Sequence, residues 1–196
     1  MAFEPVILLR RPRSAQIQRF LEDARRAPFS YGERGGSRSS GPPGYDHDHN
    51  RVRLGEGPAA FERARRALER WTMFPAGWST VTPCPAPLEE GVTVAVAFHL
   101  LGAWWLNACR IVYVLDEREP VRRRGFAYGT LSCHVERGEE CFAVEELADG
   151  SVWYDLRAFS RPRFWAARLA RPVARSLQRR FVRDSQAAMQ AAVARA

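Results

Sequence analysis

The chain has 196 residues, of which 46% are hydrophobic, 11% aromatic and 27% charged, with a formal net charge of +8. These proportions are typical of a globular domain and exclude a disordered or fibrous protein, and the sequence has no run of 18 apolar residues that would span a membrane. We therefore expect one domain over residues 1–196. The apolar run at 6–9 is short and has no basic segment before it, which argues against a signal peptide and predicts a cytoplasmic protein.

All 30 basic residues are arginines. A strongly basic chain can indicate a nucleic-acid or anionic-membrane partner. The arginines are scattered, however, and their clusters at 10–13, 122–124 and 179–183 lack the neighbouring stacked aromatic residues that a binder of single strands needs. The favoured interpretation is a solvated surface built from arginine, and we do not expect a nucleic-acid partner.

The four cysteines are Cys84, Cys109, Cys133 and Cys141. They form no C-x-x-C pair, so the sequence suggests neither a zinc ribbon nor a thioredoxin-type redox site. Three of them fall in apolar segments, where a free cysteine packs as a small hydrophobic side chain. We expect reduced thiols and predict no cofactor.

The N-terminal half predicts two helices separated by a long loop. Residues 14–27 repeat apolar side chains at three- and four-residue spacing, with Ser14 as the expected cap and Pro28 ending the pattern. Residues 58–73 show the same spacing. Between them, residues 30–57 are rich in Gly, Ser, Pro and Asp, and predict an irregular loop that is a candidate lid.

From residue 92 the pattern changes to a period of two, which is typical of strands. Residues 92–100 predict a half-buried strand, and 103–115 are apolar on both faces, which predicts a central or curved strand. Three more strands are predicted at 125–133, 139–147 and 151–159. Their connections are short, which predicts an antiparallel sheet of five to six strands.

Residues 161–195 predict a long C-terminal helix. Its apolar residues recur every four positions, at Trp165, Leu169, Val173, Leu177 and Phe181. Ser160 is the expected cap, and Pro172 is expected to break or kink the helix because it removes one backbone hydrogen bond. The remaining helix of roughly 20 residues would span about 30 Å. The chain is therefore predicted to be an α+β protein whose last helix packs on the sheet.

Several stretches of the sheet region resemble a known family. They are 125–131 (Gly-Phe-Ala-Tyr-Gly-Thr-Leu), His134, 138–140 (Gly-Glu-Glu), Phe142, 149–153 (Asp-Gly-Ser-Val-Trp) and 158–162 (Ala-Phe-Ser-Arg-Pro). Together with upstream pieces, they resemble DUF1990, a family of bacterial and plant proteins defined only as a domain of unknown function, over almost the whole chain. One departure is Cys133, where the family often has glycine before the histidine.

The resemblance implies a fold more than an activity. Strands followed by a long helix are similar to the helix-grip superfamily of START and birch-pollen-allergen-like proteins, in which a curved sheet wraps a C-terminal helix around an apolar cavity. Members bind lipids, steroids or polyketides, and a few are cyclases or hydrolases. We therefore expect a small, mainly apolar ligand, lipid-like or polyketide-like, between sheet and helix, with 30–57 as entrance or lid. The alternative is a cyclase- or hydrolase-type enzyme using the same cavity.

Candidate ligand-binding residues follow from the strand face that each residue occupies. Phe126, Tyr128 and Thr130 share a face that combines aromatic rings with hydroxyl groups, which suits a pocket wall; the alternative is an outward face of ordinary strand formers. The expected ligand-binding set is Trp104, Arg110, Phe126, Tyr128, Thr130 and Tyr154.

Arg110 is the one charged residue on an otherwise apolar strand face. If that face points inward, the guanidinium needs an acidic partner or a bound anion, because an unpaired buried charge is too costly. Glu139, Glu140 and Asp155 are the available partners. The favoured interpretation is a cross-strand ion pair without a ligand, and the alternative is a polar anchor for the ligand.

The candidate catalytic residues are Tyr128, His134, Glu139 and Glu140. An imidazole beside a carboxylate is suited to acid–base catalysis near neutral pH, but the sequence has no G-x-S-x-G motif and Cys133 faces away from its neighbour His134. The favoured interpretation of His134 is a turn residue whose ring bonds to the backbone. Whether the protein is an enzyme stays open.

The run Asp46-His47-Asp48-His49 contains only metal-ligand types. Adjacent residues in a polar loop do not converge easily on one ion, and no distant ligand is indicated. The favoured interpretation is therefore that there is no metal site, and whether this loop binds a metal ion stays open.

Overall fold

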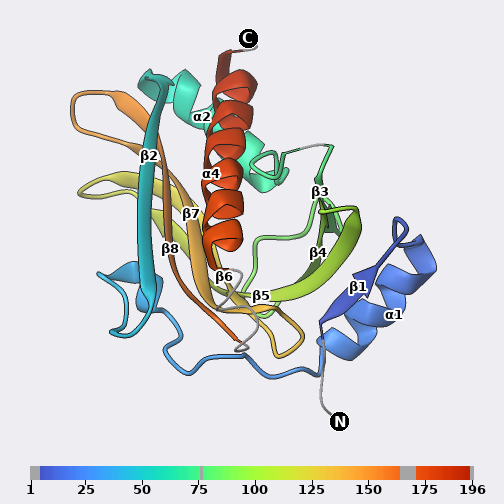
Figure 1. Cartoon of the computed structure of the whole chain (residues 1–196). Helices are drawn as coiled ribbons and strands as arrows, with labels where there is room; N and C mark the ends of the chain where they lie inside the picture. The colour runs from blue at the N-terminus through green and yellow to red at the C-terminus, as the bar shows by residue number, and fades with distance from the viewer. Residues whose placement is uncertain (1–4, 76, 164–170, 195–196) are drawn as a thin grey trace.

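The computed structural model describes residues 5–75, 77–163 and 171–194, and shows an antiparallel sheet that bends around the C-terminal helix (Figure 1). In chain order the elements are β1 (Val6–Leu8), α1 (Ser14–Ala24), a short 3-10 helix η1 (Gly36–Arg38), β2 (Asp46–Glu56), α2 (Gly57–Glu69), β3 (Ser79–Thr82), β4 (Thr93–Leu100), β5 (Ala103–Glu117), β6 (Arg122–Thr130), β7 (Glu136–Glu146), β8 (Ser151–Pro162) and α4 (Arg171–Ala194). The sheet has eight strands in the order β2-β8-β7-β6-β5-β4-β3, and β1 pairs with β5.

The predicted α+β architecture is confirmed. The five predicted strands are β4 to β8, which form an antiparallel meander, and the two N-terminal helices are α1 and α2. Three further strands were not predicted. β1 and β3 contain three and four residues, which is too short for a periodic signal, and β2 is predominantly polar.

The prediction that residues 30–57 form one irregular loop is wrong for their second half. Residues 46–56 form the edge strand β2, which pairs antiparallel along β8 from Asp46↔Ser160 to Glu56↔Ser151. Side chains of β2 alternate between half-buried and exposed. Because an edge strand is blunted by charged side chains, the chain forms this strand without an apolar stripe.

The sheet has an inner face, which holds α2 and α4, and an outer face, which is convex. Phe126 and Phe142 belong to the same buried cluster as Phe61 of α2 and Met189 of α4. Residues at the same alternate positions of β6 and β7 therefore point to the inner face. On the outer face α1 packs through Leu21 against β4 and β5. A bulge in β5 between residues 111 and 113 shifts the alternation of that strand by one residue, so odd-numbered residues before the bulge and after it lie on opposite faces.

The predicted cap at Ser160 is wrong, because Ser160 and the two residues that follow it belong to β8. Its hydroxyl instead accepts a 3.2 Å hydrogen bond from Nε2 of Gln178 in α4. The described helix begins one residue before Pro172, and Trp165 and Leu169 of the predicted stripe lie outside the described residues. None of the described helices is long and apolar enough to cross a membrane.

Candidate functional site

The interior between the sheet and α4 is divided into a packed part and a cavity. In the packed part Phe126, Phe142 and Tyr154 are fully buried with Trp71. The hydroxyl of Tyr154 lies 2.9 Å from that of Ser185 in α4, a hydrogen bond that ties the helix to β8. Phe126 and Tyr154, both expected to contact a ligand, therefore belong to the core and not to the cavity wall.

The cavity lies between the first half of α4 and the concave sheet, and has a volume of about 840 Å³. This volume falls within the range of small-molecule sites, roughly 300–1,000 Å³. One side is apolar, with side chains from β4, β5 and α4 that include Val96, Phe98, Trp105, Leu177 and Phe181.

The other side of the cavity is polar, and strand pairing aligns its residues across the sheet. Asp48 of β2 and Glu140 of β7 both lie opposite Ala158 of β8, and Tyr128 of β6 lies opposite Glu140. These four residues form one row across four strands, and all of them line the cavity. The small side chain of Ala158 leaves space between the two carboxyl groups.

Glu140 and Tyr128 form a hydrogen-bonded pair in this row. The Tyr128 hydroxyl donates to the carboxylate at 2.8 Å. Burial raises the pKa of Glu140 to about 7, against an opposing effect of the Tyr128 hydrogen bond, and burial also raises the pKa of Tyr128. Glu140 can therefore donate or accept a proton near neutral pH.

Glu136 adds a third carboxyl group to the same wall, beside those of Asp48 and Glu140. Burial raises the pKa of Glu136, whose carboxylate accepts hydrogen bonds of 3.1 Å from Nε2 of Gln178. Asp48 binds both terminal nitrogens of Arg175 in α4, at 2.5 and 2.7 Å. The guanidinium offsets the charge of Asp48 and leaves Glu136 and Glu140 without a cation in direct contact among the described residues.

His134 lines the cavity beside these carboxyl groups. Its Nδ1 accepts a 2.9 Å hydrogen bond from the backbone N–H of Glu136, which agrees with the turn interpretation. Burial lowers the pKa of His134 to about 4, so the ring is neutral at physiological pH. Because Nδ1 is an acceptor, the proton of the neutral ring is on Nε2, and Nε2–H is the donor that His134 can offer a ligand.

Asn107 is a cavity residue that the sequence analysis missed. It is only 2% exposed and lies on the inner face of β5. Its Oδ1 accepts a 3.3 Å hydrogen bond from the backbone of Val135, and its Nδ2 has no partner among the described residues. One amide on a strand face that is otherwise apolar was the signal that could have identified it.

Thr130, an expected polar anchor, lines the cavity but its hydroxyl group is already bonded. It accepts a 2.9 Å hydrogen bond from the backbone N–H of Gly138 and lies 2.6 Å from the hydroxyl of Ser30. It therefore holds the end of β6 against β7 and has little capacity left for a ligand.

Trp104 and Arg110 lie on the outer face, away from the cavity, which does not agree with their expected roles. Trp104 packs beside α1 and stacks on His99. Arg110 has none of the acidic partners that were considered. Its Nη2 instead donates to three carbonyl oxygens at the end of α1, those of Ala24, Arg25 and Ala27, at 2.9–3.1 Å. A cation at a helix C-terminus is favourable because it opposes the helix dipole.

Glu139 also differs from its expected catalytic role, because the alternation of β7 places its carboxylate on the outer face. It accepts hydrogen bonds from Tyr31 Oη at 2.7 Å, from the backbone N–H of Gly35 and of Ser37, and from Ser37 Oγ. This carboxylate fixes residues 31–37 against the side of the sheet opposite to the cavity, a position that does not fit a lid. Asp155, the third considered partner of Arg110, pairs with Arg51 and Arg157.

Strand alternation places the four side chains of residues 46–49 on opposite faces of β2. Asp46 and Asp48 are half-buried, and His47 and His49 are exposed on the other face. His49 Nε2 lies 2.7 Å from the carboxylate of Asp155. Within the described part of the chain, no group of three or more His, Cys, Asp or Glu side chains could hold a metal ion.

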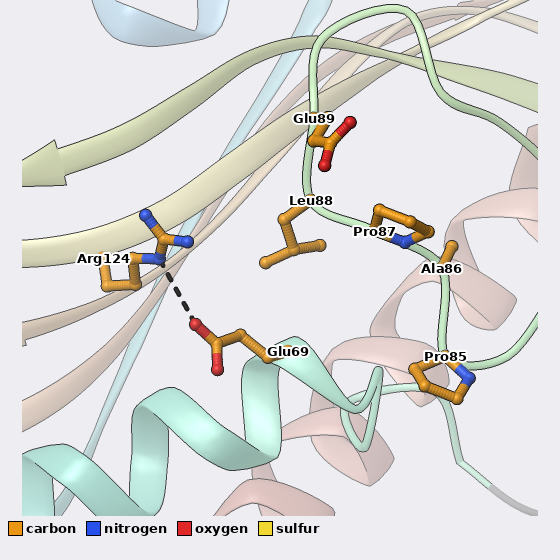
Figure 2. A pocket seen from close by; sticks show the side chains of 7 residues that line it. All are labelled: Glu69, Pro85, Ala86, Pro87, Leu88, Glu89 and Arg124. Atoms are coloured by element: carbon orange, nitrogen blue, oxygen red, sulfur yellow. Dashed lines mark ion pairs between the residues drawn. The ribbon is translucent and has the colours of Figure 1, made fainter.

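A second pocket of about 400 Å³ is open and lies on another part of the surface. Figure 2 shows Glu69 and Arg124 pointing toward each other on one side of it and the proline-rich segment 85–89 on the other. The two side chains form an ion pair of 3.5 Å. The larger cavity is the better candidate site because it is deeper in the fold and combines an apolar wall with buried hydrogen-bonding groups.

Comparison with known proteins identifies the family of the chain. The model of the domain of unknown function DUF1990 matches residues 30–188. The chain belongs to the DUF1990 family. It is 32% identical over 195 residues to a UPF0548 protein of Dictyostelium discoideum, covering 90% of both chains. It is 37% identical over 193 residues to a UPF0548 protein of Deinococcus radiodurans, covering 91% of this chain and 94% of that protein.

Solved structures resemble the chain at low sequence identity. A hypothetical protein from Helicobacter pylori, jhp0584, has a TM-score of 0.50 and 13% identity, covering 78% of this chain and 89% of that chain. Ara h 8.0201 has a TM-score of 0.47 and 12% identity, covering 76% of this chain and 98% of that chain. Identity at this level describes the fold and no activity.

Proposed function

We propose that this DUF1990 protein binds a small, mainly apolar molecule in the cavity between α4 and the concave sheet. The observation that carries the proposal is the combination of an apolar wall on β4, β5 and α4 with buried hydrogen-bonding groups on the opposite wall. Apolar surface supplies the affinity of such sites and a few polar groups fix the orientation of the ligand.

The polar end of the cavity selects the chemistry of the ligand. Asn107 Nδ2 and His134 Nε2–H are donors, and Glu140 accepts when ionised and donates when protonated. A hydroxyl or carbonyl group of the ligand matches these partners. An anionic headgroup does not, because Glu136 and Glu140 would repel it in a partly desolvated space. The expected ligand is therefore a neutral amphiphile with an oxygen-containing group at one end.

Two fluorescent probes test this ligand class. N-phenyl-1-naphthylamine is neutral and apolar, and 8-anilino-1-naphthalenesulfonate has the same rings and one sulfonate. We expect the neutral probe to bind at least about tenfold more tightly, a difference of about 1.4 kcal/mol. No binding of the neutral probe, or preference for the sulfonate, would contradict the proposal.

A cavity-filling variant shows where the probe binds. Val96 lies on the inner face, is 1% exposed and lines the cavity. Val96→Phe is expected to weaken binding of N-phenyl-1-naphthylamine at least about tenfold, because the ring occupies the ligand's space. The matched control is Val112→Phe, which adds the same volume against the outer-face cluster. Native mass spectrometry of the purified protein is expected to retain a co-purified apolar molecule in the wild type and to lose it in Val96→Phe.

Acid–base catalysis in the same cavity is a second candidate function, favoured by the pKa of Glu140 near 7. A hydrolase or cyclase would use Glu140 with Tyr128, and His134 Nε2–H as a neutral donor. Release of p-nitrophenol from p-nitrophenyl butyrate tests the hydrolase form. Turnover should be lost in Glu140→Gln and kept in Glu90→Gln, an exposed control; equal rates in the two variants would reject this candidate.

A further inference from the structure

We propose that the rim of the cavity docks on the surface of an anionic lipid bilayer. The apolar rim consists of Ile7, Leu101 and Val173. These side chains are 52%, 80% and 46% exposed, and all three line the cavity. They therefore lie where the cavity meets solvent.

Exposed large hydrophobic side chains are concentrated at this rim. Among the described residues four such side chains are exposed, and the fourth, Leu9, follows directly on β1, which carries Ile7. Exposed apolar groups gathered around one opening, rather than scattered singly, mark a surface that is covered by a partner. Three separate parts of the chain supply them: β1, the β4–β5 turn and the first turn of α4.

The β4–β5 turn exposes its apolar side chain against a backbone preference. Leu100 pairs with Ala103, so Leu101 and Gly102 form a two-residue hairpin turn, and both have positive φ, at 52° and 75°. This turn favours Asn-Gly, and a leucine with positive φ is disfavoured. Neither folding nor solubility accounts for a leucine that is 80% exposed at this position, whereas insertion into lipid does.

The charges next to the apolar rim fit an anionic surface. Residues 5–13, which include β1, contain three arginines and no acidic residue, and residues 172–183 of α4 contain four arginines and no acidic residue. Arg175 is neutralised by Asp48, and Asp184 lies 3.4 Å from both Arg180 and Arg183 and offsets one of these charges. Arg179 and Arg183 are exposed and line the cavity. Basic residues beside exposed aliphatic side chains are the pattern that binds anionic membrane surfaces.

Tryptophans flank the tip of the turn on the β5 side. Trp104 and Trp105 are half-buried, and Trp105 lines the cavity opposite Ile7 of β1. Tryptophan is enriched at the interface of membranes because it combines an apolar ring with a polar N–H. Docking in this orientation would open the cavity toward the lipid, so the proposal extends the proposed function by naming the bilayer as the source of the apolar ligand.

Co-sedimentation with large unilamellar vesicles tests the docking surface without any ligand. We expect the wild type to sediment with phosphatidylcholine vesicles containing 30% phosphatidylserine at low salt, to bind pure phosphatidylcholine vesicles much more weakly, and to be released as salt screens the charges. Absence of binding to the anionic vesicles at low salt would overturn the proposal.

Variants separate the apolar rim from overall charge. Leu101→Asn suits the positive φ, so it should fold at least as well as the wild type, and it should weaken vesicle binding about tenfold or more. Arg179→Gln/Arg183→Gln should also weaken binding to anionic vesicles. The control Arg66→Gln/Arg118→Gln removes the same charge from exposed positions outside the cavity and should bind nearly as the wild type does. Equal losses in the two double variants, or unchanged binding of Leu101→Asn, would overturn the proposal.

The wild-type titration with N-phenyl-1-naphthylamine reports on the cavity separately. Probe binding without vesicle binding would overturn only the docking surface. Vesicle binding without probe binding would support the docking surface and contradict the ligand-binding function.

Discussion

Tyr128 donates a 2.8 Å hydrogen bond to the carboxylate of Glu140 directly across β6 and β7, and both residues line the cavity. The pair marks the boundary between two parts of the interior. Two residue pairs further along the same strands, and on the same face, Phe126 and Phe142 are fully buried in the aromatic core. The sheet thus holds a packed half that stabilises the fold and an open half that exposes hydrogen-bonding groups to a ligand.

Glu140 is expected to make the protein less stable as pH rises from about 4.5 to about 7. Its folded pKa, about 7, is higher than the ordinary value of 4.5, so in this window the folded state binds more protons than the unfolded state, and the free energy of unfolding falls with pH. The effect is at most about 3 kcal/mol. Urea unfolding at pH 5 and pH 8 should show a change in stability that is more negative in the wild type and in the control Glu90→Gln than in Glu140→Gln. The comparison between variants is needed because His134 contributes an opposite change that all three proteins share. The same pH dependence in Glu140→Gln would assign the effect to another group.

His134 is expected to stay neutral, with the proton on Nε2, down to about pH 5. Its folded pKa is lowered to about 4 from 6.5, so between these values only the unfolded state gains a proton and stability falls as pH decreases. This dependence opposes that of Glu140 and should become visible in Glu140→Gln. Long-range ¹H–¹⁵N NMR at pH 5.5 should show an unprotonated Nδ1 and a protonated Nε2. A ring that titrates near pH 6.5 would contradict this environment.

Arg110 is expected to stabilise the fold without affecting the ligand. Arg110→Met removes hydrogen bonds to three carbonyl groups at the end of α1 and one to Thr93, and should reduce the free energy of unfolding by about 2 kcal/mol. Binding of N-phenyl-1-naphthylamine should stay within twofold of the wild type. Arg118→Met, at an exposed position, is the control and should change neither quantity. Loss of probe binding at unchanged stability would restore the ligand-anchor interpretation.

Glu139 is expected to hold residues 31–37 against the outer face. Glu139→Gln keeps the shape of the side chain but removes the charge that accepts hydrogen bonds from Tyr31, Gly35 and Ser37. We expect a loss of about 2 kcal/mol in stability, because hydrogen bonds to charged groups are stronger. Limited trypsin digestion should cut this variant after Arg34 or Arg38 faster than the wild type or Glu90→Gln. Equal rates of cleavage in all three proteins would show that other contacts hold the segment.

The elements whose residue pattern is local could be predicted from the amino-acid sequence alone. A period of two predicted β4 to β8, and helical spacing predicted α1, α2 and the final helix, because each buries one continuous side. Strand parity also correctly grouped Phe126 with Tyr128 on one face. Residues 46–56 escaped prediction because their strand depends on pairing with β8, about 100 residues away, and their side chains are polar on both sides.

Which residues face the cavity depends on how elements far apart in the chain pack together. The strand at 103–115 is apolar on both faces, so parity could not say whether Trp104 and Arg110 or Trp105 and Asn107 point inward. The position of α1 on the outer face decides it, because that helix covers the first pair and offers Arg110 its carbonyl groups. The alternation of a strand gives the face of a residue but not its position along the sheet. It therefore could not separate Phe126 and Tyr154, which are core residues, from Tyr128, which lines the cavity. Local periodicity is set by neighbours in the chain, whereas a cavity is set by where distant elements fail to fill the space between them.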